Sequence, residues 1–518
     1  MKTLRTDCLV IGAGLAGSAY ALRAAKAGLS CEILCLSEPL EANSDWAQGG
    51  IIYDTSPDPA KLTADIMEAG DHMSNPAAVG QLVREGPRIV RQVLIEEAGV
   101  AFDRDPSGHL DLTKEGGHTE RRIIHSKDTT GHAILSAVAG RVDQARGITR
   151  RKGWVAIDLL TLSHSSAEAA DKYHPLTCFG AYVLDTRTGE VSAIVAKKTV
   201  LACGGLGQIF LHTTNQPGSV GHGVAMAYRV GARLIDLEYV QFHPTVFAGK
   251  NAPPFLISEA VRGEGAVLVN VRGERFMDGV HPLGSLAPRD VVSRAIRHEL
   301  VSSGQSCVFL DLSAMPAGFA RARFPSIYER CLAHGVNIER EPIPVVPAAH
   351  FACGGVHTDL NGRTNIANLG AAGETACTGL HGANRLASTS LLECLTSATF
   401  AAEADAADIA LGGFRLPEPR PWESPTRKAD PVLIRQDMLQ IQHTMWNYAG
   451  VVRSPRRLTR ARRILLELRE EIQSFYRGCG LTRDLIELRN AVQTALLVVH
   501  AAALNPVSKG CHFVAPDE

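Results

Sequence analysis

The chemistry-bearing residues nearest the amino terminus are the glycines of the segment 12–17, which reads GAGLAG and fits the pattern GxGxxG. Such a turn lets the backbone approach a pyrophosphate, and the helix that follows offers its positive end to the phosphate. An apolar run at 7–11 precedes the turn, and a run rich in Ala and Leu at 15–27 follows it. The order of strand, glycine turn and helix therefore predicts a dinucleotide site.

The residue that would hold a ribose of this dinucleotide should follow the second strand, expected at 31–36. An acidic residue usually ends that strand, and here Ser37 and Glu38 are the candidates. The glycine motif does not separate a nicotinamide from a flavin dinucleotide. A loop of mostly small residues at 43–50 could lie against a flat ring, because its glycines let main-chain atoms reach the ring edge. On this segment alone, an ordinary surface loop remains the alternative.

Further along the chain, two arginines and two histidines could together bind a small molecule with two carboxylates. Burying both negative charges is costly unless each carboxylate meets paired donors. The planar guanidinium group matches a carboxylate in two hydrogen bonds, and each charge-assisted bond contributes about 1.5–3 kcal/mol. The candidates are Arg289, Arg385, His243 and His350. A lone histidine is more often structural, and Arg289 alone could pair with Asp290, so the prediction depends on the four together.

The glycine clusters indicate that the chain returns three times to one nucleotide-binding layer. After the turn at 12–17, the run 203–207 follows an apolar strand at 198–202, and the run 371–374 precedes an apolar helix that starts near Ser390. The span between the last two clusters contains strand-like and helical pieces, including 290–300, but no dinucleotide turn. We therefore expect an inserted cap there.

The last hundred residues have a different character. The segment 416–421 is too rich in proline for a helix or a central strand and indicates a linker. Beyond it, apolar residues recur three and four positions apart at 458–475 and 485–499, which is typical of amphipathic helices packed as a bundle.

These elements predict an α/β protein with a Rossmann-like dinucleotide-binding domain, an inserted α+β capping domain and a C-terminal helical bundle. The expected boundaries are 1–236 for the first part of the binding domain, 237–350 for the cap, 351–410 for the return segment and 411–518 for the helices. A chain of 518 residues is too long for one ordinary core, which agrees with several domains.

Composition excludes several classes of protein. Lys and Arg number 53 against 54 Asp and Glu, so a nucleic-acid binder is not expected. No apolar run approaches the roughly 20 residues of a membrane helix. The sequence also has no HxxxH or HExxH pattern on an expected helix, so a metal site is not expected. The twelve cysteines are scattered and no export signal precedes them, which predicts reduced thiols in a cytoplasm. One basic run is expected to be a solvated helix face: Arg453, Arg456, Arg457, Arg460, Arg462 and Arg463.

Five further motifs are similar to those of the flavoprotein family of succinate dehydrogenase and fumarate reductase. They are AQGG at 47–50, QFHPT at 241–245, PRD at 288–290, HFACGG at 350–355 and HGANRL at 381–386. The motifs occur in the order of the family and spread over most of residues 7–395, and the helical tail resembles the family's C-terminal domain less specifically. The resemblance implies FAD as the cofactor.

Two features resemble the aspartate-oxidising branch of this family. The respiratory enzymes carry a histidine that bonds covalently to the flavin, whereas Asn43 stands at the matching position, so the FAD should be held non-covalently. The segment TKEGGH at 113–118 is similar to the one whose glutamate, here Glu115, faces the substrate amine in that branch.

The resemblance also implies roles for individual residues. The expected FAD contacts are Gly12, Ala13, Gly14, Leu15, Ala16, Gly17, Asn43, Ser44, Asp45, Trp46, Ala47, Gln48, Gly49, Gly50, Glu374, Ser390 and Leu391, with Ser37 or Glu38 at the ribose. His222, in the segment GHG at 221–223, is a further candidate for FAD contact, although the family often has Asp in this motif. The expected substrate contacts are Glu115, His243, Ser258, Glu259, His350 and Arg385, where the family usually has Thr in place of Ser258. Arg289 is the expected catalytic, proton-transferring residue.

The implied activity is oxidation of L-aspartate to iminoaspartate, with electrons passed to oxygen, giving H₂O₂, or to fumarate. The product would feed quinolinate formation and NAD biosynthesis, and quinolinate synthase is a possible partner. The alternative within the family is a soluble fumarate reductase or succinate dehydrogenase subunit, from which Asn43 and Glu115 would distinguish the chain. A flavin-binding protein without turnover is a further alternative, whereas a nicotinamide dehydrogenase would need a second GxGxxG turn that the sequence lacks.

Overall fold

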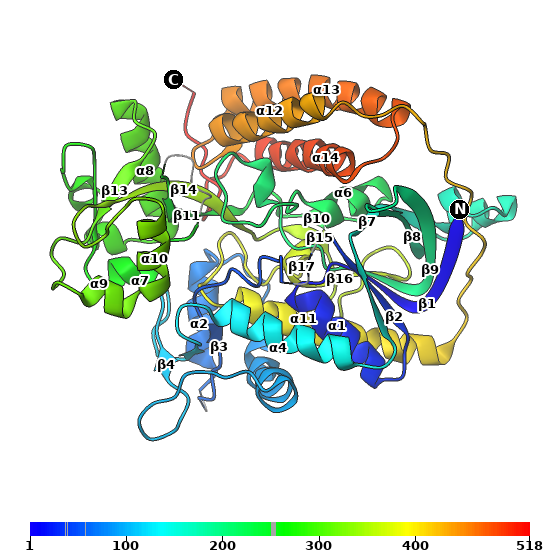
Figure 1. Cartoon of the computed structure of the whole chain (residues 1–518), viewed down its shortest axis with the longest axis horizontal. Coiled ribbons are helices and arrows are strands. Elements are labelled where there is room, and N and C mark those ends of the chain that lie inside the picture. The colour runs from blue at the N-terminus through cyan, green and yellow to red at the C-terminus, as the bar shows by residue number, and fades with distance from the viewer. Residues whose placement is uncertain (37, 39, 57, 250–254, 518) are drawn as a thin grey trace.

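The central sheet of the protein brings the three glycine clusters to one edge. The computed structural model describes residues 1–36, 38, 40–56, 58–249 and 255–517 (Figure 1). The strand order is β6-β2-β1-β9-β8-β7, with β16 beside β9, and β1 runs parallel to both β2 and β9. The strands are β1 (Lys2–Ile11), β2 (Cys31–Cys35), β6 (Ile148–Lys152), β7 (Trp154–Thr161), β8 (Cys178–Asp185), β9 (Glu190–Leu201) and β16 (Leu369–Ala371). The predicted threefold return to one layer is confirmed.

The first turn of this layer is as tight as its sequence predicts. Helix α1 (Leu15–Lys26) follows β1 and leads to β2. Gly12 has φ +118°, and a Cβ there would lie 2.1 Å from the carbonyl oxygen of Ala202. A Cβ on Gly17 would lie 2.0 Å from the carbonyl oxygen of Gly12. Both positions therefore need glycine, one because of its conformation and both because of close backbone approach.

Helices cover both faces of the central sheet. Figure 1 shows α1, α4 (Thr130–Gln144) and α11 (Ser390–Leu411) below the sheet, and α12 (Pro431–Ala449), α13 (Pro455–Gly478) and α14 (Arg483–Leu504) above it. Around these lie the shorter elements: β3 (Ile51–Ile52), α2 (Ala60–Ala69), α3 (Pro76–Ile89), η1 (Val90–Ala98), β4 (Leu112–Thr113), β5 (Ile123–Ile124), α5 (Leu162–Ser165), α6 (His222–Arg229), β10 (Leu234–Ile235), β15 (Gly355–His357) and β17 (Ala376–Cys377). The strand β3 pairs with β5, and this places the loop at 43–50 beside the segment at 113–118.

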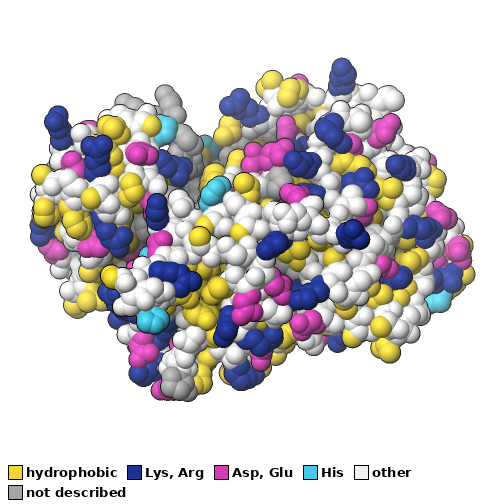
Figure 2. Space-filling view, turned by 60° about the horizontal axis from the view of Figure 1, so that its bottom comes forward, with side chains coloured by type: hydrophobic (Ala, Val, Ile, Leu, Met, Phe, Trp, Pro, Cys, Tyr) yellow, Lys and Arg dark blue, Asp and Glu magenta, His cyan; other side chains and the backbone are white. Residues whose placement is uncertain are grey.

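A second, antiparallel sheet forms the lobe at the left of Figure 1. Its order is β11-β14-β13-β12, built from β11 (Val240–Phe247), β12 (Val267–Val269), β13 (Val308–Asp311) and β14 (Ile343–Ala352). Helices α7 (Glu259–Gly263), α8 (Arg289–Ser303), α9 (Phe319–Arg323) and α10 (Pro325–Ala333) accompany it. Figure 2 shows the lobe set off from the body by a notch, with positive and negative side chains interspersed on both. The segment just before Ser258 lies beside β11, with an isolated bridge between Leu256 and Val246.

The C-terminal helices form the predicted bundle. They are α12 (Pro431–Ala449), α13 (Pro455–Gly478) and α14 (Arg483–Leu504). The apolar stripe of α13 is buried against the others, at Leu458, Ala461, Leu465, Leu468 and Ile472. None of the helices in the described residues is long and apolar enough to cross a membrane.

One residue of the basic run does not belong to a solvated face. Arg453 precedes α13 and is 0% exposed. Its guanidinium group donates to the carbonyl oxygens of Ala449 and Glu238, and to Nδ1 of His512 at 2.6 Å. The expectation that Arg453 is solvated is therefore wrong, because the turn before α13 points the side chain inward to carbonyl groups that need a donor. The other arginines of the run are exposed.

Two glycine substitutions should have opposite effects on stability. Gly17→Ala should lower the free energy of unfolding by about 1–3 kcal/mol, because the new methyl group meets a backbone oxygen that cannot move aside. Gly140→Ala, inside α4 with open space around its Cβ, should raise it by about 0.5–1 kcal/mol. Denaturant unfolding of both variants checks this. Equal effects would show that the turn tolerates a side chain.

Candidate active site

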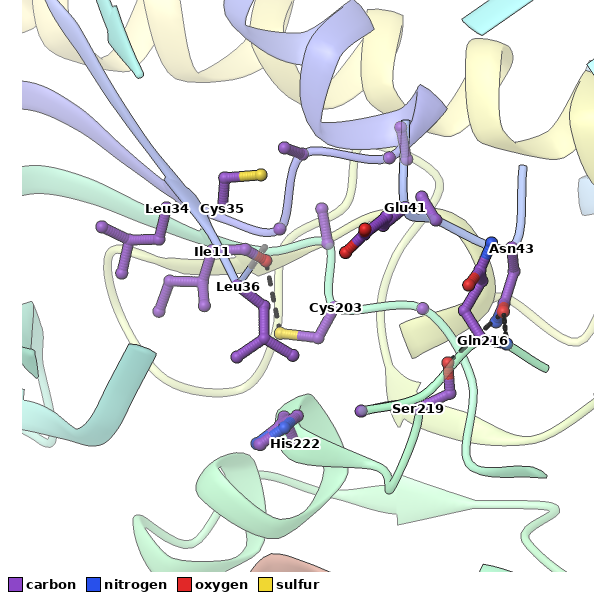
Figure 3. Close-up of a pocket in the computed structure, with 18 of the residues that line it drawn as sticks. Ile11, Leu34, Cys35, Leu36, Glu41, Asn43, Cys203, Gln216, Ser219 and His222 are labelled. Atoms are coloured by element: carbon purple, nitrogen blue, oxygen red, sulfur yellow. Dashed lines mark hydrogen bonds between the residues drawn. The ribbon is translucent and has the colours of Figure 1, made fainter. Parts of the chain in front are cut away.

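Two cavities meet beside the loop at 43–50 and form one continuous site. The first lies at the carboxyl ends of β1 and β9 (Figure 3), and the second lies between the loop at 43–50 and the lobe of the antiparallel sheet. Asn43, Ser44, Glu374 and Cys394 line both. An elongated ligand can therefore pass from the central sheet to the lobe.

The first cavity offers an anion site at its floor. Gly12, Ala13, Gly14, Leu15 and Ala16 line it. Gly14 is the residue before α1 and has no side chain to cap this helix end, where only the Leu15 N–H is seen to donate to a side chain, the Ser44 hydroxyl at 3.3 Å, among the described residues. The free N–H groups and the positive end of the helix dipole favour a phosphate there. Gly17 does not line the cavity and acts instead by letting α1 pack on the turn.

The far end of this cavity holds acidic side chains suited to a ribose. Glu38 lines the cavity, but its carboxylate accepts a hydrogen bond from Lys152 at 2.9 Å near the surface. Ser37 lies outside the described residues. Glu41, which the sequence analysis did not select, also lines the cavity, and Figure 3 shows its carboxylate directed inward. Glu41 lies well beyond the end of β2 in the sequence, and only the tertiary structure shows that it returns to the cavity.

His222 presents a donor to the first cavity. It is the first residue of α6, and its Nδ1 accepts a hydrogen bond from the side-chain amide of Asn490 at 2.8 Å. Burial, reinforced by Arg483 and Arg229, lowers the pKa of His222 to about 4. The neutral ring therefore carries its proton on Nε2, which lines the cavity and finds no partner among the described residues. A buried donor of this kind needs an acceptor from a ligand.

The loop at 43–50 connects the two cavities, but not all of it faces them. Ala47, Gln48, Gly49 and Gly50 line the second cavity together with Asn43 and Ser44. The amide oxygen of Asn43 accepts from the backbone N–H of Gln216 at 2.7 Å and from the Ser219 hydroxyl at 3.3 Å. Asp45 and Trp46 are not among the lining residues. Asp45 instead pairs with His132 at 2.8 Å, and Trp46 is 38% exposed.

The second cavity collects every residue expected to contact a substrate. Its lining includes Glu115, His243, Ser258, Glu259, Arg289, His350 and Arg385. These residues come from β11, α7, α8, β14 and three loop segments, so no single element carries the site. The geometry predicted from the motifs, a cluster of cationic and imidazole side chains around one cavity, is what the structure has.

A shared set of acceptors orients the two arginines. Arg289 donates from Nε to Glu259 at 2.7 Å. The side-chain oxygen of Gln241 accepts from Arg289 at 3.4 Å and from Arg385 at 3.1 Å. Burial disfavours the charge of Glu259, but Arg289 and Arg262 outweigh it and lower the pKa of this carboxyl. Gln241 belongs to a recognised motif, yet its bridging position depends on two distant loops and could not be read from the sequence.

Arg385 is the more deeply buried of the two. Its side chain lies over the ring of Phe351, with the guanidinium carbon 4.9 Å from the ring centroid. Burial, followed by the charge of Arg289, lowers the pKa of Arg385 to about 10. Its Nε has no hydrogen-bond partner among the described residues. The guanidinium group stays protonated at neutral pH, and the surplus of positive charge favours an anionic ligand.

The two histidines are held as neutral rings. Nδ1 of His243 accepts from the backbone N–H of Thr245 at 3.2 Å, so Nε2 carries the proton and remains unpartnered among the described residues. Nδ1 of His350 lies 2.7 Å from the hydroxyl of Thr214, a residue that no motif indicated. Burial lowers the pKa of both rings well below 6.5, and Arg289 lowers them further. Both rings can therefore donate a hydrogen bond to a carboxylate without being charged.

Glu115 lines the same cavity as these cationic and imidazole side chains. One carboxylate oxygen accepts from the Ser388 hydroxyl at 2.7 Å and the other from the backbone N–H of Gly50 at 3.3 Å. Ser258, by contrast, caps α7 by accepting from the N–H of Ala260 at 3.3 Å.

The second cavity also has an open helix end and a buried carboxyl group. Ser390 and Leu391 begin α11 and line the cavity, and no side-chain cap closes this end of the helix. Burial raises the pKa of Glu374 to about 7, while the N–H of Ala352 donates to it at 3.0 Å. In the described residues, no group of three His, Cys, Asp or Glu side chains could hold a metal ion.

The buried histidines should make folding sensitive to acid. A histidine with a lowered pKa in the folded state takes up its proton only on unfolding, so its contribution to stability is complete above pH 6.5 and is lost as the pH falls. For His243 the loss should approach about 1.4 kcal/mol per pH unit. His243→Asn keeps an acceptor for the Thr245 N–H, and its apoprotein should show a shallower fall of the unfolding free energy between pH 6.5 and about pH 5. Parallel curves for variant and wild type would contradict this.

Comparison with known proteins gives the same assignment over the whole chain. The family described as FAD binding domain matches residues 7–391, and the family described as fumarate reductase flavoprotein C-term matches residues 438–515. The chain is 44% identical over 516 residues to L-aspartate oxidase 1 of Ralstonia nicotianae, covering 98% of this chain and 94% of that protein. It is 43% identical to L-aspartate oxidase of Pseudomonas aeruginosa, again covering 98% and 94%.

Solved structures agree with the fold. The quinol fumarate reductase flavoprotein of E. coli superposes with a TM-score of 0.87 at 27% identity, covering 99% of this chain and 92% of that one. Sdh1 of Mycobacterium smegmatis gives a TM-score of 0.84 at 27% identity, covering 99% and 89%. Taken with the glycine turn, the two joined cavities and the cluster of arginines and histidines, these matches establish FAD as the cofactor. The chain belongs to the L-aspartate oxidases, within the flavoprotein family of succinate dehydrogenase and fumarate reductase.

Proposed function

We propose that the second cavity binds L-aspartate and that the protein oxidises it to iminoaspartate. The observation that carries this proposal is the position of Glu115, whose carboxylate lines the same cavity as Arg289, Arg385, His243 and His350. A dicarboxylate without an amine has no need of a negative group there. L-aspartate carries two carboxylates and one ammonium, and the cavity offers donors for the first two and an acceptor for the third.

The residues of the first cavity fit FAD. The cradle at Gly12 and Gly14 and the uncapped end of α1 suit the pyrophosphate, Glu38 or Glu41 suits a ribose, and Nε2 of His222 supplies a donor that lacks a partner in the described part of the chain. The residues at 43–50 and the start of α11 would lie along the ring, where the open helix end favours negative charge. FAD supplies, when bound, the acceptor for the hydride that leaves the substrate α-carbon.

The cofactor is proposed to be held without a covalent bond. The respiratory enzymes of the family form their covalent bond to the flavin through a histidine ring nitrogen at the position that Asn43 occupies here. The amide of Asn43 cannot form this bond, and its oxygen is engaged with Gln216 and Ser219. FAD should therefore leave the protein on acid denaturation.

Orientation of the substrate follows from the charges around the cavity. One arginine and one neutral histidine are available for each carboxylate, and Glu115 fixes the ammonium, so a three-point attachment positions the α-carbon. Arg289 is proposed to take part in proton transfer from the ammonium. The hydrogen bond from Arg289 to Glu259 holds the guanidinium group at the cavity. The carboxylate of Glu259 also balances the positive charge of that group.

The later steps are carried over from the resemblance. Electrons are proposed to pass to oxygen, giving H₂O₂, or to fumarate, and iminoaspartate is proposed to feed quinolinate formation, the first stage of NAD biosynthesis, with quinolinate synthase as partner. A cytoplasmic setting is proposed from the sequence, in which twelve cysteines are scattered and do not form a short disulfide framework.

The role of His222 can be tested through FAD affinity alone. His222→Phe removes the Nε2 donor and should weaken FAD binding roughly tenfold, the effect of one hydrogen bond to a buried ligand. His222→Gln can place an amide donor near Nε2 and should restore part of the affinity. Titration of the apoproteins with FAD, followed by flavin fluorescence, gives the dissociation constants. Equal affinity of wild type and His222→Phe would remove His222 from the cofactor site.

The substrate is tested by an anaerobic spectrum. Mixing the FAD-loaded protein with L-aspartate should bleach the flavin absorbance, whereas succinate should bind without bleaching it. Bleaching by succinate and not by L-aspartate would contradict the proposal and favour a fumarate reductase or succinate dehydrogenase subunit. A yellow protein that neither compound reduces would indicate a flavin-binding protein without turnover.

The proposed proton transfer has its own variant. Arg289→Leu should keep bound FAD, because Arg289 does not line the first cavity, and should lose nearly all turnover of L-aspartate. Flavin content and steady-state rates measure the two effects separately. Turnover close to that of the wild type would exclude Arg289 from the mechanism.

A further inference from the structure

We infer that Ser388 is a positioning residue for amine recognition, which holds the carboxylate of Glu115 so that the site selects an amino-dicarboxylate over a plain dicarboxylate. This inference rests on the proposed function and adds to it a residue that no motif or family match assigns. Ser388 lies three residues after Arg385, on the loop that leads into α11.

The contact between Ser388 and Glu115 is direct and well sheltered. The Ser388 hydroxyl donates to Oε2 of Glu115 at 2.7 Å, and Ser388 is 8% exposed. Oε1 of the same carboxylate accepts from the N–H of Gly50 at 3.3 Å. The two donors hold the plane of the carboxylate, and each oxygen keeps a lone pair for an ammonium. Without the hydroxyl, only the longer bond to Gly50 would orient the group.

The backbone aims this hydroxyl. Ser388 has φ +59°, a left-handed conformation that residues other than glycine rarely adopt. Its carbonyl oxygen accepts from the N–H of Ile52 at 3.3 Å, which fixes the peptide against β3. The conformation points the side chain toward Glu115 rather than along the loop. Strain of this kind persists only where surrounding contacts enforce it.

The segment that carries Glu115 is anchored to the same loop and to the protein core. Nε2 of His118 lies 3.0 Å from the carbonyl oxygen of Ala387, the residue before Ser388. On the other side, Arg122 is 2% exposed and pairs with Asp65 at 2.7 Å. Glu115 is thus carried on a segment with fixed ends. The hydrogen bond from Ser388 is the contact that sets the direction of its side chain.

This arrangement couples the two halves of substrate recognition. Arg385, which faces a substrate carboxylate, and Ser388, which holds the partner of the ammonium, belong to one short loop. The distance between the carboxylate donors and the ammonium acceptor is therefore fixed by a single piece of backbone. A substrate with both groups at that spacing gains both contacts, and succinate gains only the first.

The test compares L-aspartate with succinate, which differs from it only in lacking the amine. Ser388→Ala should raise the KM for L-aspartate about tenfold, the effect of one hydrogen bond to a charged group, with a much smaller change in kcat. The inhibition constant of succinate against L-aspartate should change far less. Binding of both compounds to the oxidised protein, followed by the shift of the flavin spectrum, gives the same comparison without turnover.

Two further variants separate the hydroxyl from the backbone. Ser388→Gly adopts a positive φ without strain, so it should raise the KM for L-aspartate as much as Ser388→Ala does. In the background of Glu115→Gln, Ser388→Ala should add no further loss, because residues that act through one another are not additive. This pattern supports the inference.

Three results would overturn it. These are equal losses of L-aspartate and succinate binding in Ser388→Ala, a wild-type KM in Ser388→Gly, and full additivity with Glu115→Gln. Failure of the proposed function is distinguishable, since it appears in the unmodified protein as the absence of bleaching by L-aspartate.

Discussion

The structure depends on one electrostatic constraint: two guanidinium groups are buried in the same cavity, and only one of them forms a hydrogen bond with a carboxylate in the described part of the chain. Arg289 has Glu259 as a partner, but Arg385 has only neutral acceptors, among them the side-chain oxygen of Gln241. Burying a charged group without a group of opposite charge costs free energy, so the cavity favours binding of an anion. The cost is met by the fold around it, and binding of a dicarboxylate recovers it.

Other features of the site follow from this surplus of positive charge. His243 and His350 lie next to the arginines, and burial together with those charges keeps their rings neutral. They can thus donate hydrogen bonds to a carboxylate without adding to the repulsion. Glu115 is the complementary case, because it brings a carboxylate to the same cavity. The neutral donors, cations and carboxylates around the cavity would give the proposed substrate, with its three charged groups, one orientation.

The division of the chain into two sheets explains how such a site can be built. The central sheet ends in the turn and helix termini that suit a dinucleotide, and the antiparallel sheet of the lobe contributes β11 and β14, which carry the two histidines. Residues such as Glu374 and Asn43 line both cavities, so the proposed cofactor and substrate sites adjoin each other. Catalysis of this class needs contact between two ligands, and the adjoining cavities supply it.

The sequence by itself determined the local features. The turn at 12–17, the strand–helix order around it and the apolar stripe of α13 follow from steric limits on glycine and from helical periodicity, which act between neighbours in the chain. Family motifs also identified the arginines and histidines of the second cavity. The tertiary structure alone decided the contacts between distant segments: Glu41 in the first cavity, Gln241 between two arginines, Ser388 on Glu115 and Arg453 in the interior. The physical reason is that a hydrogen bond or a buried charge depends on which groups folding brings within about 3 Å of one another, and spacing along the chain does not contain that information.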